Sequence, residues 1–283
     1  MRLVYTRKNR KIIRVLKNYL YVIPALVFLI LFTAYPIMRS VYLSFFDTDS
    51  VFSFMEYVGL KHYREMLHNE VFSEVCLNTL IYGVLQVVLS TVLGFLIALA
   101  ANSKRNRFKS FFKVSLFYPY ILPWTVGAMI WMYLLHPTRG IVNALLNTRI
   151  QWLNSYDLTL YVLVFISVWK TVGFNFLLFL SGMQSIPQEL YEAYSLESGK
   201  SFGAIRHITI PMLGPTTFVA VLLAIVGSFQ SVDLIYIMTQ GRPGNSTNTL
   251  IYYIYQEGIT SWNIGYGSAL STFLFLCLLC LLY

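Results

Sequence analysis

A polar stretch, IPQELYEAYSLESGKSFGAIRHITIP at residues 186–211, interrupts an otherwise strongly apolar chain. Apolar runs long enough to cross a bilayer as helices flank it on both sides. Charged groups are costly inside the hydrocarbon, so a segment that contains three glutamates, a lysine and an arginine is expected to lie outside it. The pattern therefore predicts an exposed loop, held between two membrane spans, that meets a partner.

The rest of the chain has the composition of a polytopic membrane protein. Hydrophobic residues make up 57% of the sequence, charged residues make up 12%, and the mean hydropathy is +0.62. Apolar runs of about 18 residues or more predict an all-α fold with about six transmembrane helices. A basic segment at residues 1–18 is expected to precede a single transmembrane domain at 19–283. The predicted spans are 19–46, 79–101, 112–135, 158–182, 212–239 and 264–283.

The distribution of lysine and arginine predicts the orientation. Basic side chains gather at residues 2–17, before the first span, and at 104–113, near the start of the third. Because such clusters stay on the cytoplasmic side, the N-terminus and the loop at 186–211 are predicted to be cytoplasmic. The first apolar run is too long for a signal-peptide core, so we expect it to remain as an uncleaved anchor.

The loop itself is predicted to fold as two short helices. Pro187 suits the first turn of a helix, and Ser198-Gly199 is typical of a helix end. Ser201 is a candidate cap for a second helix that Pro211 would terminate. Such a knob suits a groove in a cytoplasmic subunit, while an amphipathic loop lying on the membrane surface is the alternative.

The loop resembles a known motif. Glu192-Ala193-Tyr194, together with Ile208, Ile210 and Pro211, is similar to the EAA loop of permease subunits in binding-protein-dependent ABC importers. The segments 180–190 and 169–175 look like the carbohydrate branch of that family. The resemblance covers essentially the whole chain. Tyr194 stands where the family has a second alanine, and Ser198 stands where it has a glycine.

The resemblance implies a type I ABC importer fold in a bacterial cytoplasmic (inner) membrane. It implies import of a sugar or oligosaccharide, with glycerol phosphate or a related polyol as the alternative substrate. The implied partners are a second, unlike permease subunit that forms a heterodimer with this one, a dimer of ATPase subunits and an extracytoplasmic solute-binding protein. This chain would hold no cofactor, since the ATPase binds ATP and Mg. The coupling contact would comprise Glu189, Glu192, Ala193, Tyr194, Leu196, Glu197, Ser198, Gly199 and Arg206.

Polar groups inside the predicted spans form a candidate substrate path. Lys170 and Asp233 are ionisable groups at membrane depth, where they either pair structurally or contact substrate. The uncharged polar and aromatic residues of this path could hydrogen-bond to sugar hydroxyls and stack on sugar rings, or they could form hydrogen bonds between helices. The predicted path comprises Gln86, Tyr118, Trp169, Lys170, Asn175, Gln230, Ser231 and Asp233.

Other chemistry is disfavoured by the residues. Gly199-Lys200-Ser201 is not a phosphate-binding loop, because the required earlier glycine is replaced by Tyr194. The histidines have no metal-ligand spacing, Cys277 and Cys280 lie inside an apolar run, and no face suits nucleic acid. No nucleophile and base stand together, so an enzyme is not expected. The alternative from another functional class is a secondary transporter. This sequence lacks the midplane carboxylates expected of such a transporter, apart from Asp233.

Overall fold

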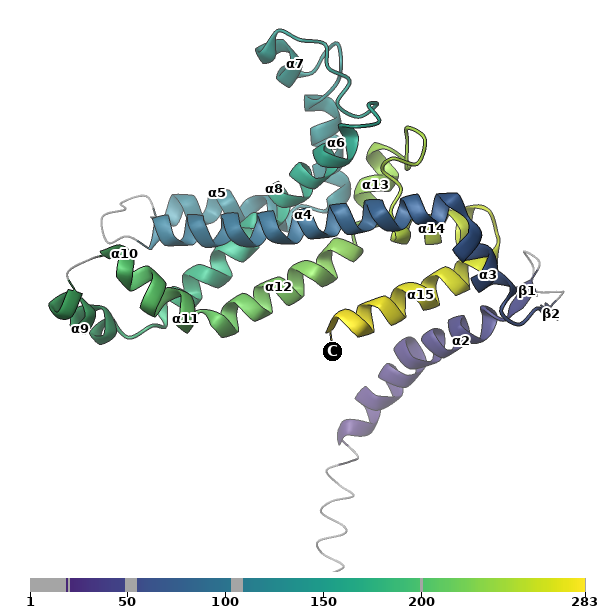
Figure 1. The fold of residues 1–283 in the computed structure, drawn as a ribbon, viewed down its shortest axis with the longest axis horizontal. Coiled ribbons are helices and arrows are strands. Elements are labelled where there is room, and N and C mark those ends of the chain that lie inside the picture. The colour runs from purple at the N-terminus through teal and green to yellow at the C-terminus, as the bar shows by residue number, and fades with distance from the viewer. Residues whose placement is uncertain (1–18, 20, 49–54, 103–108, 199–200, 283) are drawn as a thin grey trace, which may run out of the picture. The chain divides into compact units, whose positions relative to one another are not determined.

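The computed structural model describes residues 19, 21–48, 55–102, 109–198 and 201–282 (Figure 1). They are mostly helical, as predicted. The chain divides into two compact units, one of residues 1–68 with 254–281 and the other of residues 69–253 with 282–283. Among the described residues, four helices are long and apolar enough to cross a membrane, or six if two bent helix pairs each count as one span. The prediction of about six spans agrees with the larger number.

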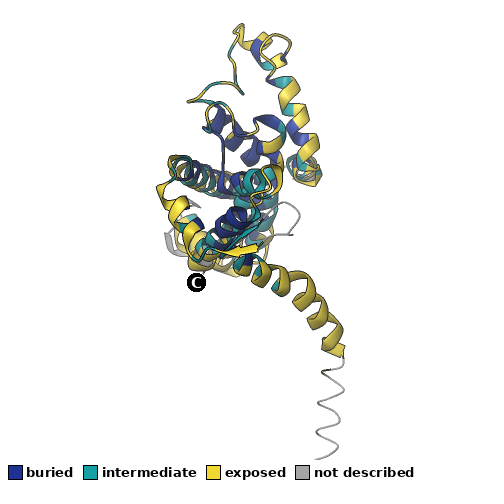
Figure 2. Cartoon of the chain, turned by 90° about the vertical axis from the view of Figure 1, so that its right-hand side faces the viewer, coloured by how far each residue is buried: buried dark blue, intermediate teal, exposed yellow. Residues whose placement is uncertain are grey.

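The first unit contains two of these spans. A helix at 21–43 includes the π-helical η1 (Ile30–Ala34) and α2 (Tyr35–Leu43), and none of its apolar window is buried (Figure 2). The antiparallel strands β1 (Phe46–Thr48) and β2 (Met55–Tyr57) and the helix α3 (Lys61–His68) follow. The C-terminal part consists of η3 (Gln256–Thr260) and α15 (Ile264–Leu282).

An exposed ion pair joins α3 to β1 in this unit. Lys61 Nζ donates to Asp47 Oδ2 at 2.9 Å, and this contact raises the pKa of the Lys61 ammonium group. Gly265 of α15 lies against the Phe46 carbonyl, and a β-carbon there would come within 2.7 Å of His62 Nε2. The absence of a side chain at Gly265 therefore allows α15 to approach β1 and α3 closely.

The second unit is built on α4 (Glu70–Ala101) and α8 (Thr159–Gln184). Asn69 caps α4, because its Oδ1 accepts a hydrogen bond from Val71 N at 2.9 Å. The helix therefore begins nine residues before the predicted span at 79–101. Hydropathy could not place this start, because the first turns of α4 carry Glu70 and Glu74 outside the apolar run, where acidic residues favour a helix N-terminus.

Polar side chains join α4 to α8 at regular intervals. Gln86 Nε2 donates to Thr171 Oγ1 at 3.3 Å, and Asn175 Nδ2 donates to Ser90 Oγ at 3.1 Å. The partners are four residues apart on each helix, so both pairs lie on one helix face. One turn further along α4, the two backbones come close together. A β-carbon on Gly94 would lie 2.7 Å from Asn175 Cβ.

The third predicted span is not one straight helix. Residues 112–135 correspond to α5 (Lys109–Ile121) and α6 (Trp124–Leu134), which are bent by 105°. Pro123 stands at the break, where it lacks an N–H for the helix and disfavours helical geometry at Leu122. A short helix, α7 (Ile141–Leu146), follows α6.

The fifth predicted span, 212–239, does not coincide with the second bent pair, which joins residues 205–212 to residues 214–229 at 56°. Residues 212–239 contain α12 (Gly214–Phe229) and α13 (Val232–Met238), with a break at residues 230–231. Apolar runs lie on both sides of this short polar break, which is why hydropathy predicted one helix. A loop whose residues 246–249 are buried leads on to α14 (Leu250–Tyr255), whose residues Leu250, Tyr252 and Tyr253 are also buried.

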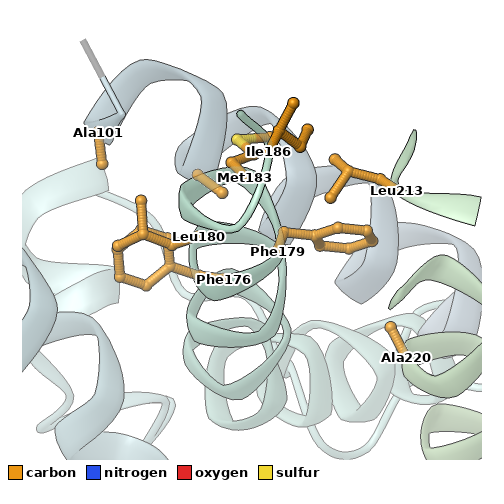
Figure 3. Close-up of a cluster of buried hydrophobic side chains, with 9 residues drawn as sticks. Ala101, Phe176, Phe179, Leu180, Met183, Ile186, Leu213 and Ala220 are labelled. Carbon is orange, nitrogen blue, oxygen red and sulfur yellow. The ribbon is translucent and has the colours of Figure 1, made fainter. Parts of the chain in front are cut away.

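A compact apolar cluster surrounds the C-terminal half of α8 (Figure 3). Phe176 and Phe179 are three residues apart on α8, and both are almost fully buried. Phe179 packs edge-on against Phe95 of α4, with 5.6 Å between the ring centroids, and points toward Leu213. The cluster therefore packs α8 against α4 and Leu213, next to the loop that begins at residue 186.

The close contact at Gly94 generates a stability prediction. Gly94→Ala is expected to lower the stability of the detergent-solubilised protein, because the added carbon meets backbone and Cβ atoms of α8. Gly227→Ala in α12 is the matched control, since nothing lies within 4 Å of a β-carbon there. Both variants gain the same helix propensity. The clash alone should therefore lower the free energy of unfolding of Gly94→Ala by about 1–3 kcal/mol relative to Gly227→Ala, measured by thermal unfolding. Equal melting temperatures would contradict the close packing.

Candidate functional site

The polar loop folds as two helical segments, as predicted. The first is α9 (Gln188–Ser198). The second is continuous through α10 (Ser201–Ala204), the π-helical η2 (Ile205–Thr209) and α11 (Ile210–Met212). Residues 199–200 lie outside the described part of the chain, so the predicted helix end at Gly199 is not described.

The second segment does not end at Pro211, and that prediction was wrong. The helix continues to Met212 and breaks at Leu213, before α12 begins. The π-helical turn η2 stands directly before α11, where Ile210 N bonds to Ile205 O. Because a π turn changes the hydrogen-bond register, it accommodates a proline that has no N–H and crowds the preceding turn.

One face of α9 is anchored to this second segment. The Tyr191 hydroxyl lies 3.0 Å from Thr209 Oγ1, and Thr209 is buried. One turn further along, the Tyr194 ring stacks on the His207 ring with a centroid distance of 6.0 Å. Positions 191 and 194 project from the same side of a helix. Two tyrosines three residues apart therefore hold α9 by one face.

The opposite face of α9 is exposed. Glu189, Glu192, Ala193 and Leu196 are all exposed, and their i, i+3, i+4, i+7 spacing places them within an arc of about 100°. The Leu196 side chain is 90% exposed, although it is apolar. We call these four residues the outward face. An apolar side chain between two carboxylates is typical of a surface that docks into a complementary partner.

Other predicted coupling residues have different positions. Tyr194 belongs to the anchored face and not to the outward face. Arg206 is exposed on η2. The side chains of Glu197 and Ser198 lie outside the described part, as does Gly199. The structure thus brings four of the predicted residues together on one surface.

Lys170 occupies a structural position at the bend between α5 and α6. Its Nζ donates to the carbonyls of Pro119 and Tyr120 at 3.2 Å each, and also to that of Leu122. The ammonium group lies 4.9 Å from the centre of the Trp124 ring. The last carbonyls of a helix have no partner within it, so Lys170 caps α5 from α8. Of the two alternatives for Lys170, this arrangement favours the structural one.

The remaining predicted path residues divide into buried and exposed groups. Gln86 and Asn175 are buried in the contact between α4 and α8, and Ser231 is buried with its hydroxyl donated to Ser228 O at 2.9 Å. Their geometry favours hydrogen bonding between and within helices. Tyr118, Gln230 and Asp233 are exposed, while Trp169 is half-buried and packs edge-on against Trp131.

Asparagine and threonine residues hold the loop before α14 in place. Asn78 Nδ2 of α4 donates to Asn245 O at 2.9 Å and to Asn248 O at 3.2 Å. Thr79 Oγ1 accepts a hydrogen bond from Leu250 N at 2.8 Å. Asn78 and Thr79 are not among the residues of the predicted path. The sequence feature that could have indicated them is that two polar residues stand side by side at the start of an apolar run.

The comparisons with known proteins agree on one family. Residues 90–283 match the family described as "Binding-protein-dependent transport system inner membrane component". The probable ABC transporter permease protein YurN of Bacillus subtilis is 34% identical over 262 residues, which cover 90% of this chain and 89% of YurN. The sulfoquinovosyl glycerol transport system permease protein SmoG of Agrobacterium fabrum is 33% identical, with coverage of 91% and 85%.

A solved structure shows the same fold. It is the crystal structure of a bacterial alginate ABC transporter in complex with an alginate pentasaccharide-bound periplasmic protein. One of its chains superposes with a TM-score of 0.84 at 20% identity, covering 96% of this chain and 93% of that chain. The type I importer fold expected from the sequence is therefore confirmed.

The position of Lys170 generates a second prediction. Lys170→Met is expected to destabilise the detergent-solubilised protein by about 2–3 kcal/mol, because buried carbonyls lose a charged donor. Asp233→Asn is the matched control and should leave the melting temperature unchanged, since Asp233 is exposed. If Lys170 served only as a substrate contact, Lys170→Met would reduce uptake without a change in stability.

Proposed function

This chain belongs to the family of inner-membrane components of binding-protein-dependent transport systems, and we propose that it is the permease subunit of an ATP-driven sugar or oligosaccharide importer. As a member of this family it is a multi-pass membrane protein and a transport subunit, not an enzyme. We infer that α9 couples this chain to an ATPase subunit, and this inference rests on the outward face of α9.

The outward face suits an ATPase subunit as its partner. A partner groove with an apolar pocket for Leu196, flanked by basic side chains for Glu189 and Glu192, would complement it in both shape and charge. In this proposal, that partner binds ATP and Mg. The clusters of lysine and arginine before the first span and near the third support a cytoplasmic position for both the N-terminus and α9.

The route from α9 into the membrane is short and well packed. Ile186 is buried in the apolar cluster around α8, and Tyr191 and Ile208 pack against the same cluster. A pull on α9 is therefore transmitted to α8, which contacts α4 by hydrogen bonds and α5 through the Lys170 cap. In this proposal, ATP binding draws the two ATPase subunits together and turns the helices as rigid bodies around the translocation path.

Three exposed side chains of the predicted path are candidates for contacts with a sugar. Tyr118 offers an aromatic ring, and Gln230 and Asp233 offer hydrogen-bonding groups, all on exposed positions of the second unit. SmoG is named as a transporter of a sugar conjugate, and the alginate transporter binds a periplasmic protein loaded with a pentasaccharide. By that analogy the full importer contains this chain, a second permease, two ATPase subunits and an extracytoplasmic solute-binding protein.

Charge reversal on the outward face tests the coupling proposal. Glu192→Lys is expected to reduce oligosaccharide uptake by cells at least about tenfold, because it opposes a basic partner surface at a desolvated contact. Membrane insertion, followed by immunoblot of the membrane fraction, should be unchanged. Glu56→Lys on the exposed strand β2 is the matched control and should transport normally. Full uptake by Glu192→Lys would refute the assignment of α9 as the coupling element.

The energy source separates this proposal from a gradient-driven carrier. Uptake is expected to stop when cellular ATP is depleted with the membrane potential maintained. It should persist, at least at first, when the potential is collapsed with ATP maintained. The opposite pattern, measured with labelled oligosaccharide in the same cells, would support a secondary transporter.

A further inference from the structure

The anchored face of α9 ends in a contact between a tyrosine and a histidine. The Tyr194 hydroxyl lies 3.4 Å from His207 Nδ1, and the two rings are nearly parallel, with 22° between their planes. His207 Nδ1 also lies 2.9 Å from the carbonyl oxygen of Gly203. A carbonyl can only accept, so Nδ1 carries the proton in that contact and fixes the tautomer of the ring. Tyr194 therefore stacks on an imidazole that is itself held by the α10 backbone.

Gly203 makes room for the tyrosine. A β-carbon at this position would lie 3.1 Å from Tyr194 Cζ and 3.3 Å from Cε1, and it would also meet the hydroxyl oxygen. Both distances are shorter than ordinary van der Waals contact, so any other residue would displace the ring. Gly203 and His207 are one turn apart on the second segment and together form a seat for Tyr194. We call Tyr194, Gly203 and His207 the tip clamp.

The tip clamp acts together with the contact between Tyr191 and Thr209. One contact alone leaves a helix free to rotate about that point, whereas two contacts three residues apart define its rotation about its own axis. Tyr191 packs against the apolar cluster at the base of α9, so Tyr194 is the anchor nearest the tip. A rotation by one residue step, about 100°, would carry Leu196 away from the outward face.

We propose that Tyr194, seated on Gly203 and stacked on His207, is a positioning residue that sets which face α9 presents to the ATPase subunit. This inference rests on the proposed function, because it assigns a role within the same coupling contact. Tyr194 touches neither the substrate nor, in this arrangement, the partner. It acts through the direction of Glu189, Glu192 and Leu196.

Cross-linking from the outward face tests this role. Leu196→Cys is introduced into a chain whose three native cysteines are replaced by alanine, and the thiol is labelled with a maleimide that carries a benzophenone group. The complex is kept in its membrane with MgATP and irradiated, so that the benzophenone inserts into C–H bonds of whichever protein lies against position 196. Tyr194→Ala is expected to lower the yield of product with the ATPase subunit about fivefold, from loss of one aromatic contact. Tyr194→Phe keeps the stacked ring and should restore most of the yield.

A double variant separates positioning from general damage. Gly203→Val is expected to lower the yield as Tyr194→Ala does, because it displaces the ring. Added to Tyr194→Ala, it should cause no further loss, since the side chain that it displaces is already absent. Ser195→Ala, on an exposed neighbouring position of α9, is the control and should leave the yield unchanged.

The outcomes distinguish the two proposals. An unchanged cross-link yield in Tyr194→Ala, together with a normal yield from the parent chain, overturns the tip clamp and leaves the proposed function intact. Additive losses for Gly203→Val and Tyr194→Ala also overturn it. If the parent chain with Leu196→Cys gives no product with any ATP-binding protein, the proposed coupling function fails, and the role of Tyr194 fails with it.

Discussion

The close approach of α4 and α8 is the constraint on which the second unit depends. In lipid, helices gain little from burying apolar surface against each other, so close packing at small residues and hydrogen bonds between helices hold them together. Gly94 permits the backbones to meet, and the pairs Gln86 with Thr171 and Ser90 with Asn175 fix the register. A slip of one residue would separate both pairs and leave buried amides without partners.

The same helix, α8, links the membrane region to the polar loop. Its C-terminal half is buried in an apolar cluster that also includes Ile186 and Leu213, at the two ends of the loop. The described parts of the loop are two helical segments whose base belongs to the core of the unit and which contact each other through Tyr191 with Thr209 and Tyr194 with His207. A rigid base is what force transmission from a partner to the membrane helices requires.

The break between α5 and α6 has a local chemical cause, and a residue far away in the sequence satisfies the carbonyls that it exposes. Pro123 ends the helical geometry between α5 and α6, and the carbonyls left at the end of α5 need donors. In a soluble protein water would supply them, but at membrane depth a side chain must do so. Lys170 of α8 does this from 51 residues away along the chain, as counted to Pro119. A residue that resembles a substrate ligand in the sequence is therefore an element of the fold.

The mostly helical membrane class, the two helical segments of the loop at 186–211 and the family resemblance were predictable from the sequence alone. These follow from local composition and spacing, since hydrophobic length and the loop motif are properties of contiguous residues. The tertiary structure added the 105° bend between α5 and α6, the cap that Lys170 forms on α5, and the stacking of Tyr194 on His207. The two side-chain contacts join residues that are separated along the chain, and a pattern of contiguous residues does not bring such partners together.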